Sequence, residues 1–297
     1  MDWPRDLPNW PNAALSRLVP NRPHRWHVQE SGTGPLILLI HGAGGATHSW
    51  RDILPDLAQD FHVVALDLPG QGFTALGSRQ RCGLEMMAED IVSLCTAQGW
   101  QPDAIIGHSA GAAIALRLSQ RLHSAQGKTP VVIGLNAALG PFKGMAGWLF
   151  PVLAKLLALN PLMAGLFVRS VSGQGRVQAL INSTGSDLDA QGMALYERLI
   201  RDKGHVDSTL LMMSQWKLDR LLDDLPKITT PVTLIAGRKD KAVPPDVSER
   251  AAARLPDARY IPLPDLGHLA HEEQPALICN LIRETLHKNG ISGRIRD

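Results

Sequence analysis

The stretch AIIGHSAG, residues 104–111, joins a short apolar run to a helical pattern. The run AIIGH at 104–108 has the length of a buried strand, and AAIALRLSQ after Gly111 has the apolar spacing of a helix. Glycine stands two residues before and two residues after Ser109. A sharp strand-to-helix turn requires this spacing, because side chains at those positions would collide. The stretch therefore predicts a strained turn that presents the Ser109 hydroxyl above a helix N-terminus.

Similar apolar runs alternate with amphipathic segments along most of the chain. Further buried strands are expected at 36–40, 61–68, 131–137, 232–237 and 259–263. The alternating segment 24–32 is typical of an antiparallel edge strand. Helices are expected at about 48–58, 84–98, 110–124, 246–255 and 272–287. This order predicts an α/β fold with a mainly parallel sheet flanked by helices.

The interval from 139 to 225 departs from this alternation. It contains no convincing strand pattern and is rich in leucine and methionine, with glycines between helical segments. An insertion of this size between two core strands predicts a helical lid at 139–225 on a core formed by 1–138 and 226–297. The apolar segment 144–168 is interrupted by prolines and a lysine before it reaches the roughly 20 residues of a transmembrane helix. We therefore expect no membrane span, although peripheral membrane contact stays open.

The composition of the chain argues against several other classes of protein. The 297 residues carry 30 lysines and arginines against 28 acidic residues, a net charge of +2 that offers no basic field for nucleic acid. Cys82, Cys95 and Cys279 form no CxxC pair, so neither a disulfide framework nor a zinc knuckle is expected. The eleven histidines form no HExxH motif, and no metal site or cofactor is expected. The N-terminus has no signal-peptide pattern, and we expect a cytoplasmic protein.

A serine nucleophile needs a base, and the base needs an acid that orients it. Asp240 follows the expected strand 232–237, and His268 follows the expected strand 259–263. The carboxyl ends of parallel strands meet at one edge of a sheet, where sites in open α/β folds lie. We therefore predict that Ser109, Asp240 and His268 come together.

Other titratable residues stand near these two. Asp246 is expected to begin a helix, and Asp265 precedes His268 too closely to orient it. His271 is interpreted as a residue at the N-terminus of the last helix. Asp240 and His268 are therefore preferred as the acid and the base.

An oxyanion formed at the serine would need two backbone amide donors. The amide of Ala110, just after the serine, is one candidate. The loop HGAGG at 41–45 supplies the other at Ala43, because Gly42 lets the backbone turn. His41 and His108 are interpreted as bracing or pocket residues rather than as the base.

The motifs taken in order resemble the α/β-hydrolase superfamily. They are HGAGG (41–45), DLPGQG (67–72), GHSAG (107–111), AGRKDKAVP (236–244) and LGH (266–268), and the resemblance covers about 24–290. It implies an α/β-hydrolase fold with a triad of Ser109, Asp240 and His268 and an oxyanion hole at Ala43 and Ala110. Haloalkane dehalogenases and epoxide hydrolases carry aspartate where this chain has Ser109.

A narrower similarity concerns the stretches NWPN (9–12), 25–52, DLPGQGFT (67–74) and HSAG (108–111). These are similar to the magnesium-chelatase accessory proteins of bacteriochlorophyll biosynthesis, the BchO type. That resemblance implies a photosynthetic bacterium and a role near the insertion of Mg²⁺ into protoporphyrin IX, with magnesium chelatase as a partner.

Three functions stay open on this basis. The first is a serine hydrolase acting on a small hydrophobic ester or thioester. The second is a noncatalytic module that binds a tetrapyrrole or assists the chelatase, and the third is an unrelated carboxylesterase or carbon–carbon bond hydrolase. Four apolar residues of the expected lid are candidates to line a pocket for a flat, hydrophobic ligand, namely Trp148, Phe150, Met163 and Phe167.

Overall fold

A computed structural model of the chain describes residues 1–140 and 175–293. Its strands are β1 (Ser16–Asn21), β2 (His24–Ser31), β3 (Leu36–Ile40), β4 (His62–Leu66), β5 (Ala104–His108), β6 (Val131–Leu135), β7 (Val232–Gly237) and β8 (Ala258–Leu263). They form one sheet in the order β1-β2-β4-β3-β5-β6-β7-β8. β2 is antiparallel to both of its neighbours, and every other adjacent pair is parallel. The expectation of a mainly parallel sheet is confirmed.

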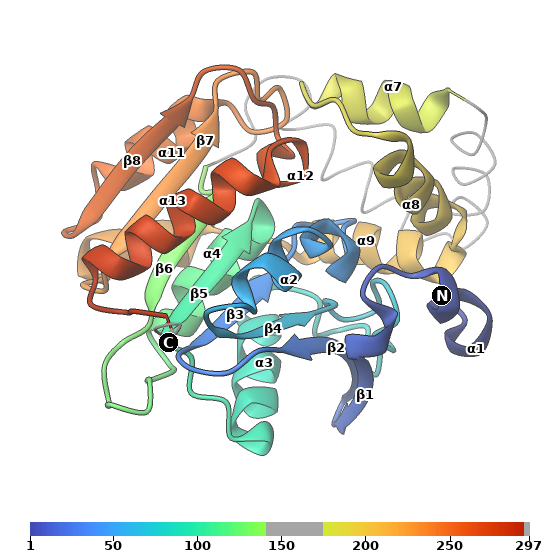
Figure 1. Cartoon of the computed structure of the whole chain (residues 1–297), viewed down its shortest axis with the longest axis horizontal. Helices are drawn as coiled ribbons and strands as arrows, with labels where there is room; N and C mark the ends of the chain where they lie inside the picture. Colours follow the sequence, from blue (N-terminus) through green and yellow to red (C-terminus); the bar gives the residue numbers. More distant parts are fainter. Residues whose placement is uncertain (141–174, 294–297) are drawn as a thin grey trace.

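Helices lie on both sides of this sheet (Figure 1). The α-helices are α1 (Trp3–Asp6), α2 (Ile53–Leu57), α3 (Leu84–Gln98), α4 (Ala110–Ser119), α7 (Arg176–Ser183), α8 (Ala190–Arg201), α9 (Lys203–Gln215), α10 (Asp219–Asp224), α11 (Pro245–Ala252), α12 (Ala270–Glu273) and α13 (Pro275–Lys288). Short 3₁₀ turns occupy Leu7–Asn9, Ala13–Leu15, Thr47–Trp50 and Leu225–Lys227.

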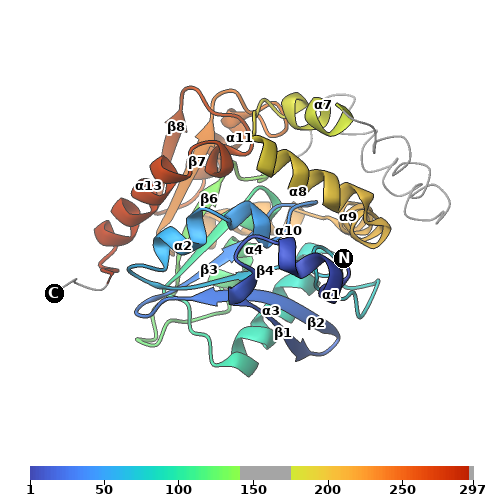
Figure 2. The same cartoon turned by 45° about the vertical axis from the view of Figure 1, so that its right-hand side comes forward.

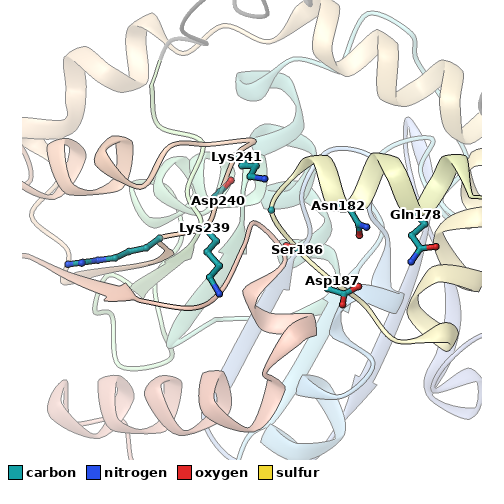
Figure 3. A pocket seen from close by; sticks show the side chains of 9 residues that line it. Gln178, Asn182, Ser186, Asp187, Lys239, Asp240 and Lys241 are labelled. Atoms are coloured by element: carbon teal, nitrogen blue, oxygen red, sulfur yellow. The ribbon is translucent and has the colours of Figure 1, made fainter.

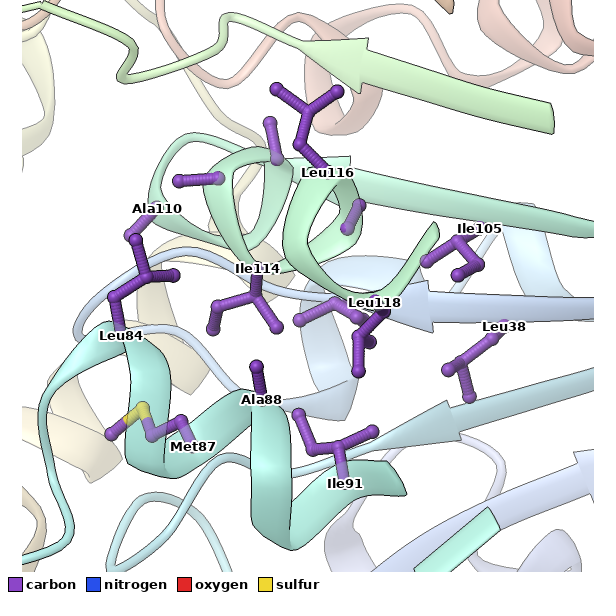
Figure 4. Packing of buried hydrophobic residues seen from close by; sticks show 14 of the residues in the cluster. Leu38, Leu84, Met87, Ala88, Ile91, Ile105, Ala110, Ile114, Leu116 and Leu118 are labelled. Atoms are coloured by element: carbon purple, nitrogen blue, oxygen red, sulfur yellow. The ribbon is translucent and has the colours of Figure 1, made fainter. Parts of the chain in front are cut away.

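The sheet buries both of its faces, which explains why its strands read as continuous apolar runs. Successive side chains of β3 alternate between the faces. Leu38 and Ile40 pack with α3 and α4, a contact that Figure 4 shows around Leu38, Ile91 and Ile114. Ile37 packs on the opposite face with α2 and α13. Burial on both faces is what parallel strands between helices require.

The predicted bounds of β3, β5, β7 and α3 agree with the structure. The segment 24–32 is antiparallel, but the prediction that it forms an edge was wrong, because β1 pairs with its outer side. β1 was missed because its sequence, SRLVPN, has only two adjacent apolar residues before Pro20 and no alternating pattern.

Two regions that were predicted to be single helices are each divided at or near a proline. The region 48–58 divides into a 3₁₀ turn and the short α2, where Pro55 lies in the first turn, the only part of a helix that tolerates a missing amide. The region 272–287 divides into α12 and α13 at Gln274, because Pro275 disfavours helical backbone at the preceding residue. The helix predicted to reach residue 124 ends at Ser119.

Between β6 and β7 the described residues form α7 to α10, of which α7, α8 and α9 lie together on one side of the molecule (Figures 1 and 2). The division into a core and a lid at 139–225 stays a prediction, and Trp148, Phe150, Met163 and Phe167 lie outside the described residues. In the part that the structure describes, no helix is both long and apolar enough to cross a bilayer.

The close approach of α4 to β3 generates a prediction. A Cβ atom on Gly111 would lie 2.2 Å from the carbonyl oxygen of Ile40, a backbone atom that cannot move aside. We expect Gly111→Ala to lower the free energy of unfolding by more than about 2 kcal/mol in urea denaturation, because overpacking displaces the helix. Gly204→Ala, also in the first turn of a helix but exposed, is the control and should be neutral or stabilising. Equal stability of the two variants would contradict the prediction.

Candidate active site

The turn between β5 and α4 holds Ser109 in an unusual backbone conformation. Its φ is 51° and its ψ is −115°, a left-handed conformation that a residue with a side chain adopts only under strain. A Cβ atom on Gly107 would lie 2.2 Å from the carbonyl oxygen of Gly111, so the turn has no room for a side chain there. The Ser109 amide donates to the carbonyl of Leu135 at 2.9 Å, which anchors the turn to β6. The serine is partly exposed at the carboxyl ends of the strands.

Asp240 and His268 meet at the ends of β7 and β8. The His268 Nδ1–H donates to Asp240 Oδ2 at 2.7 Å. The Asp240 side chain is fully buried, whereas His268 keeps 9% of its surface exposed. Since Nδ1 carries the proton, a neutral imidazole offers Nε2 as a proton acceptor.

The other candidates have different partners. Asp246 pairs with Arg250 on α11, and Asp265 pairs with Lys239. His271 is fully buried, and neither of its ring nitrogens has a hydrogen-bond partner in the described residues. The structure thus brings Asp240, rather than these acids, to His268.

His268 lies beside the serine turn. The Nε2–H of His108 donates to the carbonyl of His268 at 2.9 Å, and the two rings are 4.8 Å apart. The Ser109 hydroxyl itself has no hydrogen-bond partner within residues 1–140 and 175–293. In free enzymes the contact between nucleophile and base is often long and tightens when substrate binds.

The loop at residues 41–45 lies against the same turn. A Cβ atom placed on Gly42 would be 3.0 Å from Ser109 Cβ, so the loop backbone passes directly beside the serine. Among the described residues, the amides of Ala43 and Ala110 donate no hydrogen bond. Two amide donors next to a partly exposed serine can bind an oxygen that carries negative charge.

Two residues that the sequence analysis did not assign to the site hold this loop. Gln71 Oε1 accepts from the Gly44 amide at 2.8 Å, and the His205 Nε2–H donates to the Gly44 carbonyl at 3.1 Å. Burial lowers the pKa of His205 to about 4, so the ring stays neutral. The motif DLPGQG marked the place of Gln71, but no local pattern pointed to His205, which comes from α9.

His41 and His108 are buried beneath the loop. The His41 Nδ1–H donates to Gly42 O at 2.7 Å, and its Nε2 accepts from the Leu68 amide at 2.9 Å. Burial lowers the pKa of both histidines below the ordinary value. Both are therefore uncharged at neutral pH and fix the backbone around Ser109.

A surface pocket of about 630 Å³ lies behind the loop that carries Asp240 (Figure 3). Its lining combines α7, the segment that follows α7 and the segment that follows β7, namely Gln178, Asn182, Gly185, Ser186, Asp187, Arg238, Lys239, Asp240 and Lys241. Lys239 pairs with Asp265, outside the lining, and Ser109 is not among the lining residues. No cluster that could hold a metal ion occurs among the residues described.

A buried carboxylate joins α8 to the segment that follows His268. Glu272 accepts from the Tyr196 hydroxyl at 2.7 Å and from Arg51 Nη1 at 2.9 Å. Arg51 also contacts Asp52 and Asp189, so its charge is divided among three carboxylates. Burial therefore outweighs these partners and raises the pKa of Glu272 to about 7.

In a comparison with known protein families, residues 35–275 match the α/β hydrolase fold family. The magnesium-chelatase 30 kDa subunit of Rhodobacter capsulatus is 46% identical over 276 residues, 91% of this chain and 94% of the relative. The pimeloyl-[acyl-carrier protein] methyl ester esterase of Aeromonas hydrophila is 26% identical, over 86% of this chain and 96% of the esterase.

A solved structure with a similar fold is 2-hydroxy-6-oxo-6-phenylhexa-2,4-dienoate hydrolase from Rhodococcus sp. strain RHA1. It superposes with a TM-score of 0.72 at 23% identity, and the match covers 92% of this chain and 98% of that chain. At this identity the likeness concerns the fold alone. The predicted fold class is confirmed by the family match together with the sheet order.

The raised pKa of Glu272 predicts a pH dependence of stability. The folded protein keeps a proton on Glu272 up to about pH 7, whereas the unfolded chain loses it near the ordinary value of 4.5. The stability from the protonated form is therefore present in acid and is lost as the pH rises towards 7. We expect the Tm of Glu272→Gln to fall less than that of the unchanged protein between about pH 5 and about pH 8.

Glu284→Gln, at an exposed site on α13, is the matched control and should follow the unchanged protein. Parallel Tm curves for Glu272→Gln and Glu284→Gln would show that Glu272 is ionised throughout this range.

Proposed function

This chain belongs to the α/β-hydrolase fold family, and from that premise we propose that it is a serine hydrolase acting in bacteriochlorophyll biosynthesis. Ser109 is the proposed nucleophile, His268 the base and Asp240 the acid that orients it. The observation that carries the proposal is the 2.7 Å hydrogen bond between Asp240 and His268 at the sheet edge where Ser109 is held under strain. Similarity to a magnesium-chelatase subunit supports the pathway.

The proposed reaction begins with proton transfer from Ser109 Oγ to His268 Nε2 while Oγ attacks the substrate carbonyl carbon. The carbonyl oxygen becomes an oxyanion that accepts from the amides of Ala43 and Ala110. The imidazolium is stabilised by Asp240 and then protonates the leaving group, which departs as an alcohol or thiol. Water repeats the sequence on the acyl-enzyme, releasing the acid and restoring Ser109.

The proposed substrate is a small hydrophobic ester or thioester. A tetrapyrrole ester would fit the pathway of the magnesium-chelatase relative. Peripheral contact with a pigment-bearing membrane belongs to the same proposal.

Hydrolysis of p-nitrophenyl butyrate tests the chemistry without knowledge of the natural substrate. Ser109→Ala and His268→Ala should each lower kcat by at least about 10³-fold with little change in KM, because members of a triad act as a unit. Ser183→Ala, an exposed serine on α7, is the control and should keep full activity. A Ser109→Ala variant as active as the unchanged protein would contradict the proposal.

A second candidate function is noncatalytic assistance to magnesium chelatase, which the 46% identical relative favours. Addition of the protein to a chelatase assay with protoporphyrin IX separates the two. If catalysis is needed, Ser109→Ala should lose the stimulation given by the unchanged protein. Full stimulation by a folded Ser109→Ala variant would favour the accessory role.

A further inference from the structure

Asn136 occupies a buried and strained position between the proposed acid and the loop of the proposed base. It directly follows β6, is 1% exposed and has a left-handed φ of 47°. Its backbone amide donates to the Ile235 carbonyl of β7 at 2.7 Å. Among the described residues, Ser109 and Asn12 are the only others with a side chain and a positive φ.

The side-chain amide of Asn136 makes two hydrogen bonds. Nδ2 donates to Asp240 Oδ2 at 2.8 Å and to the Gly267 carbonyl at 3.1 Å. One NH₂ group thus contacts both the carboxylate and the residue immediately before His268. The opposite orientation of the amide would place Oδ1 against two acceptors, so the surroundings determine which atom faces Asp240.

The contacts of Asp240 show what Asn136 adds. Oδ1 accepts from the amides of Ala242 and Val243 at 2.9 and 2.8 Å, both from its own loop. Oδ2 accepts from His268 and from Asn136. Asn136 is therefore the contact that ties this carboxylate to a second strand of the sheet and fixes the oxygen that His268 uses.

The conformation and burial of Asn136 also cost the folded protein free energy. A left-handed φ is unfavourable for a residue with a side chain, and the buried Oδ1 of Asn136 has no hydrogen-bond partner among the described residues. Such a combination of strain and an unsatisfied polar atom is concentrated at functional sites. A role limited to packing would be met at lower cost by glycine, which adopts this backbone conformation without strain.

We propose that Asn136 is a positioning residue that holds the Asp240 carboxylate against His268 Nδ1. The inference rests on the proposed triad and adds a fourth member that does not touch substrate. Its two N–H groups fix the carboxylate and the backbone of Gly267 relative to one another. His268 thereby keeps its proton on Nδ1 and presents Nε2 to Ser109.

Asn136→Gly tests the proposal, because glycine accepts the left-handed backbone and removes only the side chain. Asn12→Gly is the matched control, since Asn12 has a φ of 55° and its Nδ2 donates to the Arg51 carbonyl, with no contact to the triad. With p-nitrophenyl butyrate we expect kcat of Asn136→Gly to fall about 10- to 100-fold with KM nearly unchanged. Asn12→Gly should keep the unchanged protein's kcat.

The far-downfield proton resonance of His268 Nδ1–H supplies a readout that does not depend on turnover. In Asn136→Gly it should shift upfield and exchange faster with water, because the Asp240–His268 hydrogen bond loosens, while Asn12→Gly leaves it in place. Asn136→Asp keeps the shape but replaces the donor with an acceptor, so it should lose at least as much activity as Asn136→Gly.

Equal resonances and rates in Asn136→Gly and Asn12→Gly, or full activity of Asn136→Asp, would overturn the role of Asn136. Failure of the unchanged protein to hydrolyse the ester would instead overturn the proposed function. In that case the resonance would still decide whether Asn136 positions the pair.

Discussion

Between β5 and α4 the backbone comes so close to itself and to β3 that residues 107 and 111 can only be glycine. A Cβ atom at either position would lie 2.2 Å from a backbone carbonyl oxygen. Within this tight turn Ser109 has a positive φ of 51°, and α4 begins at the next residue. The loop at Gly42 lies against the same turn, so Ser109 and both candidate oxyanion amides depend on close backbone packing at this point.

The other residues of the candidate site follow three adjacent strands on the other half of the sheet. β6, β7 and β8 are consecutive neighbours and deliver Asn136, Asp240 and His268 in that order. Burial lowers the pKa of His41 and His108, so both stay uncharged. Each ring forms hydrogen bonds with backbone atoms near the serine. His268 differs because it contacts a buried carboxylate and retains some exposure, as its proposed role of proton acceptor would require.

Sequence reasoning succeeded where a single segment determines the structure. Apolar runs located β3, β5 and β7 because both faces of these strands are buried, and the GHSAG spacing located the turn because its sterics are local. β1 was missed because its apolar residues are adjacent rather than alternating and are followed by Pro20. Asn136 and His205 were missed because their partners are 104 and 161 residues away in the chain, and no local pattern encodes such contacts.

The central claim is that this strained serine is activated by His268. Incubation with a fluorophosphonate, followed by proteolysis and mass spectrometry, tests it most directly, because these reagents modify only activated serines at an appreciable rate. The account predicts one adduct on the peptide that carries Ser109, absent in Ser109→Ala and slowed in His268→Ala. A folded protein that acquires no adduct, or that acquires one on a different serine, would contradict it.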